Sequence, residues 1–351
     1  MSKTVFVGLS GGVDSSVSAL LLKQAGYNVV GVYMKNWSKD LPGFPCPWKE
    51  DYQDAKRIAV QLGIDFKMFD FEKEYFELVV QYMLDGFKSG ITPNPDIMCN
   101  QEIKFKLFYH AAMDQGADFI ATGHYAQTKD GRLLKAVDDN KDQTYFLYRV
   151  TDDALEHTLF PIGHLTKPEV RKIAEDNNLV TAKKKESMGI CFVGKVGIKE
   201  FLSQYVETEP GMIKDQNGVV IGEHEGAIFY TIGQRHGLDV GGGLPYYVTG
   251  KDMIKNEVYV TSDINDKALW NDILNLTSVH WINKSQKSKV DSRKTLQVRT
   301  RHRAKLVDCE MEMKENGDVV LKLKDQIRAL TPGQSAVLYG SDICLGGGII
   351  Y

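Results

Sequence analysis

The stretch Ser10-Gly11-Gly12-Val13-Asp14-Ser15-Ser16 decides the fold of this chain of 351 residues. It follows an apolar run at residues 4–9, which predicts a buried first strand, and it leads into residues 17–22, whose apolar positions predict a helix. Glycines let the backbone turn sharply near a ligand, and the free amides of a helix N-terminus attract anionic oxygens. The stretch therefore predicts a phosphate-binding loop; the alternative is a helix that Asp14 or Ser15 caps without any ligand.

The loop differs from the two commonest nucleotide-binding patterns. It has neither the Gly-x4-Gly-Lys-Ser/Thr pattern nor the dinucleotide pattern Gly-x-Gly-x-x-Gly. It resembles the PP-loop of the ATP pyrophosphatases, which hold the β and γ phosphates of ATP while a substrate oxygen attacks the α-phosphorus. The resemblance implies ATP with Mg²⁺ as its counter-ion, and an adenylation reaction.

Strand-like and helix-like segments alternate over the first 150 residues, which predicts a doubly wound α/β fold with a parallel sheet. The expected strands are residues 4–9, 28–34, 65–69 and 119–122, and the expected helices are 14–25, 52–62, 72–87, 100–115 and 167–177. Ligands bind beyond the carboxyl ends of such strands, so an adenine would lie beside Met34 and Gly123. The expected ATP-binding residues are Gly8, Leu9, Ser10, Gly11, Gly12, Val13, Asp14, Ser15, Met34 and Gly123.

After about residue 210 the sequence changes to short apolar runs separated by turn signals such as Asn217-Gly218 and Asn316-Gly317. This texture predicts a small β-rich central domain and then a C-terminal β-barrel. We expect a PP-loop catalytic domain at residues 1–205, the central domain at 206–272, and the barrel at 273–351.

Composition restricts the class of protein. The formal net charge is −3, which argues against a protein that coats nucleic acid through bulk charge. The sequence lacks a run approaching the roughly 18 apolar residues of a membrane span, and its first residues do not read as a signal peptide. We therefore expect a cytoplasmic protein without a membrane partner. The five cysteines contain no Cys-x-x-Cys pair, so no metal site is expected.

Local charge differs from the net charge, because residues 284–305 are strongly basic, with Asp291 as the single acid. If residues 297–306 form a strand, alternation places Arg299, Arg301, Arg303 and Lys305 on one face. Such a stripe suits a phosphate backbone. The alternative is a solvated strand face.

Cys99 and Cys191 are the candidate reactive thiols. Cys99 stands at the expected entry to the helix 100–115, where amides and dipole stabilise a thiolate by roughly 0.3 to 1 kcal/mol. Lys104 and Lys106 add positive charge in the following turns. For each cysteine, the alternative is a small buried apolar residue. The remaining cysteines have no partner pattern and are predicted to be structural: Cys46, Cys309 and Cys344.

Nine ordered blocks resemble the tRNA-specific 2-thiouridylases, from the first strand to the C-terminus. The blocks are GLSGGVDS (8–15), FPCPWKEDY (44–52), NPDIMCNQEIKF (94–105), ATGHY (121–125), KDQTYFL (141–147), ESMGICF (186–192), YTIGQRHGL (230–238), TPGQSAV (331–337) and CLGGGII (344–350). That family activates the C2 carbonyl oxygen of the wobble uridine with ATP and replaces the oxygen with sulfur. The resemblance implies that Cys191 carries a persulfide, that Cys99 attacks it, and that a Cys99–Cys191 disulfide remains for cellular thiols to reduce.

The resemblance also implies partners and contacts. The substrate would be tRNA of the Lys, Glu and Gln type, and the sulfur donor a cysteine desulfurase or a sulfur-relay protein. Asp96 would orient the base or manage a proton, although Asn-Pro-Asp is also a common turn. Exchange needs the two cysteine α-carbons within about 4.4 to 6.8 Å, so we expect the segment with Cys191 to be mobile and to order with tRNA. The implied tRNA contacts are Asn94, Pro95, Asp96, His124, Lys141, Asp142, Gln143, Arg301, His302 and Gln334.

Two other functions are compatible with the loop. A PP-loop synthetase that adenylates a small molecule would need no paired thiols, so its activity would survive substitution of both cysteines. A non-catalytic RNA-binding protein would use ATP only to order its fold, and it would never form AMP and pyrophosphate.

Overall fold

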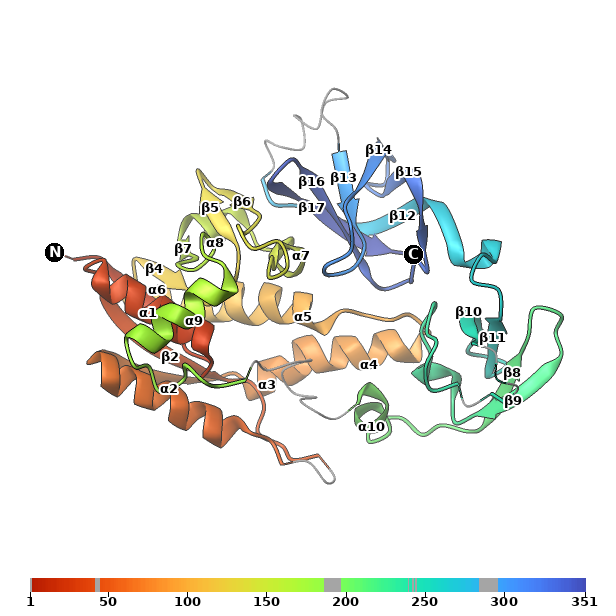
Figure 1. Cartoon of the computed structure of the whole chain (residues 1–351), viewed down its shortest axis with the longest axis horizontal. Coiled ribbons are helices and arrows are strands. Elements are labelled where there is room, and N and C mark those ends of the chain that lie inside the picture. Colours follow the sequence, from red (N-terminus) through yellow and green to blue (C-terminus); the bar gives the residue numbers. More distant parts are fainter. Residues whose placement is uncertain are drawn as a thin grey trace.

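The computed structural model describes residues 2–41, 45–185, 197–238, 240, 241, 243, 245–283 and 296–351. An α/β domain, a small central sheet and a C-terminal barrel follow one another along the chain (Figure 1). In the view of Figure 1 the α/β domain lies on the left, the barrel at the upper right and the central sheet at the lower right. No helix in these described ranges is long and apolar enough to cross a membrane.

A parallel sheet of five strands, in the order β3-β2-β1-β4-β7, forms the middle of the first domain. Its strands are β1 (Thr4–Gly8), β2 (Asn28–Lys35), β3 (Asp65–Asp70), β4 (Phe119–Ala121) and β7 (Thr158–Leu159). The doubly wound α/β prediction is therefore confirmed. Because β1 lies between β2 and β4, their carboxyl ends meet directly beside Gly8.

Helices cover both faces of this sheet, as the alternation of side chains along β1 requires. Val5 and Val7 pack in one cluster with Val17 of α1, whereas Phe6 packs in another with Phe108. The first face carries α1 (Val13–Gln24), α2 (Trp48–Leu62) and α9 (Lys167–Asp176). The other helical segments of this domain are α3 (Glu72–Tyr75), η1 (Phe76–Val80), α4 (Gln81–Lys88), α5 (Pro95–Met98), η2 (Cys99–Phe108), α6 (Tyr109–Asp114), α7 (Thr144–Leu147) and α8 (Asp152–Glu156).

The helix expected at residues 100–115 begins five residues earlier, at Pro95, and runs without a break through α5, η2 and α6. Asn94 is its N-cap, and its Oδ1 accepts a hydrogen bond from the Ile97 amide at 3.4 Å. Proline is favoured at the first helical position because its missing N–H would be unpaired there anyway. The expected position of Cys99 at the helix entry is therefore wrong: Cys99 lies in the second turn.

The central domain is a sheet of four strands in the order β10-β11-β8-β9. The predicted turn at Asn217-Gly218 is confirmed, since it joins two antiparallel strands and Gly218 has a φ of 78°. The elements are α10 (Ile198–Leu202), β8 (Gly211–Lys214), β9 (Val220–His224), η3 (Ala227–Phe229), β10 (Tyr247–Asp252) and β11 (Glu257–Thr261).

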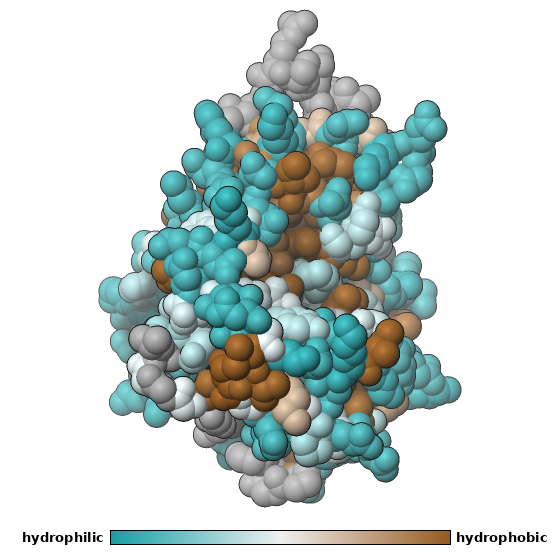
Figure 2. Space-filling model, turned by 90° about the vertical axis from the view of Figure 1, so that its right-hand side faces the viewer, coloured by the Kyte–Doolittle hydropathy of each residue, from teal (hydrophilic) through white to brown (hydrophobic). Residues whose placement is uncertain are grey.

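The C-terminal domain is a closed barrel, as predicted, because β12 pairs with β15 on one side and with β17 on the other. Its elements are η4 (Lys267–Leu269), β12 (Trp270–Trp281), β13 (Leu296–Arg299), β14 (Val307–Met313), β15 (Val319–Arg328), β16 (Ser335–Gly340) and β17 (Ile343–Ile350). Seen from the side of the barrel and the central sheet, the surface is mostly hydrophilic, with a hydrophobic strip at the level of the barrel (Figure 2).

A hairpin of the first domain extends the barrel sheet, which the sequence reading missed. Strands β5 (Gln127–Lys129) and β6 (Arg132–Leu134) pair with each other, and β6 also pairs with β17. Asp130 and Gly131 form the turn with φ values of 52° and 67°. An Asp-Gly pair is a strong hairpin signal and could have revealed these strands. The barrel is thus joined to the α/β domain by main-chain pairing.

The basic stripe expected along residues 297–306 is wrong, because the strand ends at Arg299. Arg299 is buried and pairs with Asp142 at 2.9 Å, so its charge faces the domain interface. Arg301 and Arg303 follow in a turn, where Arg303 has a φ of 63° and its Nε donates to the Asn140 carbonyl at 2.9 Å. A turn removes the period-two alternation on which the stripe depended.

Candidate active site

The glycine loop leaves the N-terminus of α1 open to a ligand. Gly12 is the N-cap, and no side chain of the described residues caps the helix, so the capping alternative for Asp14 or Ser15 is not what the structure adopts. The hydroxyls of Ser15 and Ser16 instead donate to the Gly12 carbonyl at 3.1 and 2.8 Å. Gly11 has a φ of 75°, and a Cβ there would collide with the Asp51 carbonyl. The loop therefore requires glycine and presents backbone amides.

Two neighbouring strands end against this loop, as the sequence predicted for Met34 and Gly123. A Cβ on Gly8 would lie 2.9 Å from Cε of Met34, so the two residues are in direct contact. A Cβ on Gly123 would lie 2.7 Å from the Ser15 amide nitrogen. The structure thus brings the expected ATP-binding residues together at one edge of the sheet.

We expect Gly123→Ala to weaken nucleotide binding about tenfold or more, because overpacking costs about 1–3 kcal/mol. The added methyl would meet backbone atoms of Asp14 and Ser15, which cannot move without displacing the first turn of α1. Calorimetric titration with ATP measures the effect. Gly241→Ala is the matched control, since no atom of the described part of the chain lies within 4 Å of a Cβ at that position and its φ is not in the left-handed region. Equal affinities for the two variants would contradict the prediction.

Asp14 of the loop is neutralised by a residue that the sequence reading did not select. Lys167 Nζ donates to both carboxylate oxygens of Asp14 at 2.7 and 2.8 Å, and Tyr125 donates its hydroxyl at 3.0 Å. Lys167 begins α9, which packs against α1. The ion pair keeps the Asp14 charge from repelling an anion at the loop.

Cys99 and Asp96 lie on the long helix that covers the second face of the sheet. Cys99 is 3% exposed and packs among side chains of the helix formed by residues 72–88. Burial raises the pKa of Asp96, and the charge of Lys104 opposes this rise. A half-buried carboxyl near a cation is suited to exchanging a proton. The remaining thiol of the expected pair, Cys191, lies outside the described residues.

Lys104 connects this helix with the strand end beside the loop. Its Nζ lies 3.4 Å from Nε2 of His124, and Nδ1 of His124 lies 2.8 Å from the Thr122 hydroxyl. An ammonium group can only donate, so Nε2 accepts and Nδ1 carries the hydrogen. Burial, and next the charge of Lys104, hold the pKa of His124 well below its usual value. His124 is therefore a neutral, oriented ring one residue after Gly123.

We expect Lys104→Ala to raise the pKa of Asp96, because the cation that favours the carboxylate is lost. The acid limb of any activity that needs ionised Asp96 would then move to higher pH. Carbon NMR titration of Asp96 measures the change. Lys106→Ala is the control, since Lys106 pairs with Glu102 at 2.6 Å on the opposite side of the helix. The same shift in both variants would contradict the prediction.

The expected tRNA contacts divide into accessible and buried side chains. Lys141, Gln143, Asn94, Asp96, Arg301, His302 and Gln334 are partly or well exposed, whereas Pro95 and His124 are buried. Asp142 is 1% exposed, and its carboxylate binds Arg299 and Thr144. This carboxylate therefore cannot contact tRNA directly. Burial, followed by nearby positive charges, lowers the pKa of His302 to about 4, so this ring is neutral at neutral pH.

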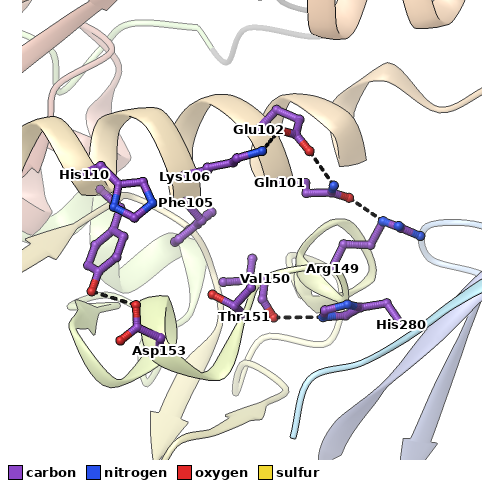
Figure 3. A pocket seen from close by; sticks show the side chains of 11 residues that line it. Gln101, Glu102, Phe105, Lys106, His110, Arg149, Val150, Thr151, Asp153 and His280 are labelled. Carbon is purple, nitrogen blue, oxygen red and sulfur yellow. Dashed lines mark hydrogen bonds and ion pairs between the residues drawn. The ribbon is translucent and has the colours of Figure 1, made fainter. Parts of the chain in front are cut away.

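A groove of about 320 Å³ lies on the side of η2 where Lys106 points (Figure 3). The side chains that line it come from η2, α6, the segment after α7, α8 and β12, and they include Gln101, Arg149 and His280. Arg149 is directed toward Gln101, and His280 toward the Val150 carbonyl. The groove thus marks where the barrel meets the helix that carries Cys99.

Three family models match the chain in succession. They are described as the tRNA methyl transferase HUP domain (residues 3–195), the tRNA methyl transferase PRC-barrel domain (199–262) and the aminomethyltransferase beta-barrel domain (271–350). Among solved structures, a 4-thiouridine synthetase–RNA complex with bound ATP is similar over 58% of this chain and 50% of that chain. Its sequence identity is 16% and its TM-score is 0.38.

Curated relatives align along nearly the whole chain under the name tRNA-specific 2-thiouridylase MnmA. The protein of Oceanobacillus iheyensis is 47% identical, with 99% of this chain and 94% of the relative covered. The Bacillus subtilis protein gives the same identity and coverage, and the Exiguobacterium sibiricum protein is 48% identical, with 99% and 93% covered. At this identity and coverage, the chain belongs to the family of tRNA-specific 2-thiouridylases.

Proposed function

We propose that the protein catalyses ATP-dependent 2-thiolation of the wobble uridine of tRNA. The observation that carries the proposal is a continuous path of contacts from the nucleotide loop to the helix of the reactive thiol. Gly123 packs on the Ser15 amide, the next residue His124 contacts Lys104, and Lys104 shares its helix with Asp96 and Cys99. The relatives that align over the whole chain bear the corresponding name.

ATP fits the loop, because the uncapped N-terminus of α1 supplies amide donors for the β and γ phosphates. Gly11 and Gly123 allow the loop to keep this form, since a Cβ at either position would collide with the backbone packed against it. The described residues contain no group of three or more His, Cys, Asp or Glu that could hold a metal. Mg²⁺ would accordingly arrive on the phosphates of ATP, as it does in many nucleotide sites.

The first chemical step is adenylation of the uridine. The C2 carbonyl oxygen attacks the α-phosphorus of ATP, the bond to the β-phosphate breaks, and pyrophosphate leaves. This step is needed because a uracil oxygen is a very poor leaving group, whereas AMP leaves readily. Asp96 would orient the base or take a proton, and the base must leave its stack to be reached.

The second step delivers sulfur. The Cys99 thiolate attacks the inner sulfur of a persulfide on Cys191, so a Cys99–Cys191 disulfide forms and sulfide leaves with the electron pair of the broken sulfur–sulfur bond. Sulfide then attacks C2 of the uridine, and AMP departs with the original oxygen. Reduction of the disulfide by a cellular thiol, a two-electron step, restores both cysteines.

The partners follow from this scheme. The tRNA would be of the Lys, Glu and Gln type, the persulfide would come from a cysteine desulfurase or a sulfur-relay protein, and the reaction would take place in the cytoplasm. The uridine would contact Asn94, Pro95 and Asp96. The other proposed tRNA contacts are His124, Lys141, Gln143, Arg301 and His302, with Asp142 acting through its neighbours.

The test is incubation of the protein with unmodified tRNA, ATP, Mg²⁺ and a persulfide source. Mass analysis of the nucleosides should find 2-thiouridine, with AMP and pyrophosphate formed alongside. Pyrophosphate exchange that needs a small molecule and no tRNA would favour a PP-loop synthetase instead. Absence of both AMP and thiolated nucleoside would favour an RNA-binding protein without catalysis.

A further inference from the structure

We propose that Gln334 and Arg149 are positioning residues that hold the helix of Asp96 and Cys99 from two sides. Through them the barrel would take part in the reaction by fixing this helix, in addition to any contact with RNA. The inference rests on the proposed function, because Asp96 and Cys99 are its reacting groups. It gives Gln334 a task different from the tRNA contact expected from its sequence.

The first point of attachment lies just before the helix begins. Gln334 Nε2 donates to the Thr92 carbonyl at 2.8 Å and lies 3.4 Å from the Pro93 carbonyl. The Thr92 amide donates in return to the Pro332 carbonyl at 2.9 Å. Gly333 has a φ of 91°, and a Cβ there would lie 2.9 Å from the Thr92 nitrogen. The barrel turn therefore fits closely on the backbone that leads into the N-cap Asn94.

The second point lies just after Cys99. Arg149 Nε donates to Oε1 of Gln101 (Figure 3). Its two terminal nitrogens donate to the carbonyl and the hydroxyl of Ser278 at 2.9 and 3.4 Å. Ser278 lies in β12 with a φ of 49°, where the pairing of β12 with β17 shifts its register. One guanidinium thus bridges the barrel and the long helix.

The two attachments lie on either side of the helical turns that contain Asp96 and Cys99. The barrel that carries Gln334 is itself packed firmly on the α/β domain. Tyr145 donates its hydroxyl to the Ser335 carbonyl at 3.0 Å, and the Tyr148 hydroxyl lies 3.0 Å from that of Ser335. All three residues are buried at the interface between the α/β domain and the barrel. A displacement of about 1 Å of a reacting group can cost about a hundredfold in rate, so loosening either point should lower kcat.

The test uses substitutions that keep shape but remove the bridging hydrogen bonds. Gln334→Glu places a carboxylate oxygen against the Thr92 carbonyl, and Arg149→Lys can reach only one of its two partners at a time. We expect each to lower the single-turnover rate of thiolation about tenfold or more. The Kd for tRNA, measured by filter binding, should stay unchanged. Matched controls are Gln216→Glu in an exposed turn and Arg57→Lys, whose side chain is 65% exposed.

The outcomes separate a positioning role from the alternatives. Weaker tRNA binding with an unchanged saturating rate would overturn the proposal, since it would make these residues RNA contacts. An unchanged rate and an unchanged Kd would overturn it too. Should the unaltered protein form no 2-thiouridine, the proposed function fails. Amide hydrogen exchange of residues 94–101, measured without RNA, then tests whether Gln334 and Arg149 hold the helix, because exchange should be faster in both variants than in the controls. Equal exchange would overturn it.

Discussion

Replacing Cys99 with serine is expected to abolish 2-thiouridine formation while pyrophosphate release with tRNA and ATP persists. In the proposed reaction, adenylation uses the glycine loop and Asp96, whereas release of sulfur from the persulfide needs a thiolate, and a serine hydroxyl is far less nucleophilic toward sulfur. Removing a nucleophile that acts in a concerted unit costs several orders of magnitude, so we expect a loss of at least about a thousandfold. Nucleoside mass analysis and a pyrophosphate assay measure the two steps separately.

Cys309→Ser is the matched control for this experiment. Burial, with a smaller effect of Asp308, raises the pKa of Cys309 to about 12, so this barrel thiol stays protonated and unreactive. It should thiolate tRNA at the rate of the unaltered protein. If Cys99→Ser also thiolated at the normal rate, sulfur could not pass through a thiolate at this position. Loss of pyrophosphate release in Cys99→Ser would show instead that the substitution disturbs the adenylation site.

The sequence was most informative where local backbone chemistry decides the structure. The glycine loop, the strands β1 to β3 and the helices α1, α2 and α9 lie within a few residues of their predicted positions. Each is encoded by nearby residues: glycines for the turn, and apolar periodicity for the strands and helices. The contacts of Met34 and Gly123 with the loop also followed, because strand order places the carboxyl ends of neighbouring strands together. The domain limits at residues 205 and 272 stay a prediction.

The predictions were wrong where a local sequence signal was overlooked, or where the charge of a side chain was taken to show which way it points. Asn94-Pro95 is a helix start, and overlooking it placed Cys99 at the helix entry. Arg299 was assigned to a basic surface, because a sequence shows that a side chain is charged but not which way it points. Its direction is set by Asp142, a residue of another domain.

The interface between the α/β domain and the barrel was the least predictable part. Tyr145, Leu147 and Tyr148 share one buried cluster with Val337 and Tyr339 of β16. No periodicity within either segment specifies this partner, because the contacts join residues far apart in the sequence. The positions of Gln334 and Arg149 depend on the same interface. Their role in holding the long helix could not be inferred before the two domains were seen together.

Asp142→Ala is expected to lower the free energy of unfolding by about 3–5 kcal/mol, because it leaves the charge of a buried partner uncompensated. Asp142 is 1% exposed and Arg299 7% exposed, so water cannot replace the lost contact. The carboxylate also accepts hydrogen bonds from Thr144 and from the Ala136 amide, which hold the segment leading into α7. Urea unfolding followed by tryptophan fluorescence measures the loss.

Two further variants test whether the loss of stability in Asp142→Ala comes from the unpaired charge of Arg299. Replacing both partners, Asp142→Leu with Arg299→Met, removes the charges together and should recover much of the stability, as apolar replacements of buried ion pairs often do. Asp176→Ala breaks a surface pair with Lys172, whose side chains are 58% and 74% exposed, and should cost no more than about 1 kcal/mol. If Asp142→Ala cost as little as Asp176→Ala, the buried pair would not hold the barrel against the α/β domain. The barrel that carries Gln334 would then be held against the α/β domain by the packing of Tyr145 and Tyr148 alone.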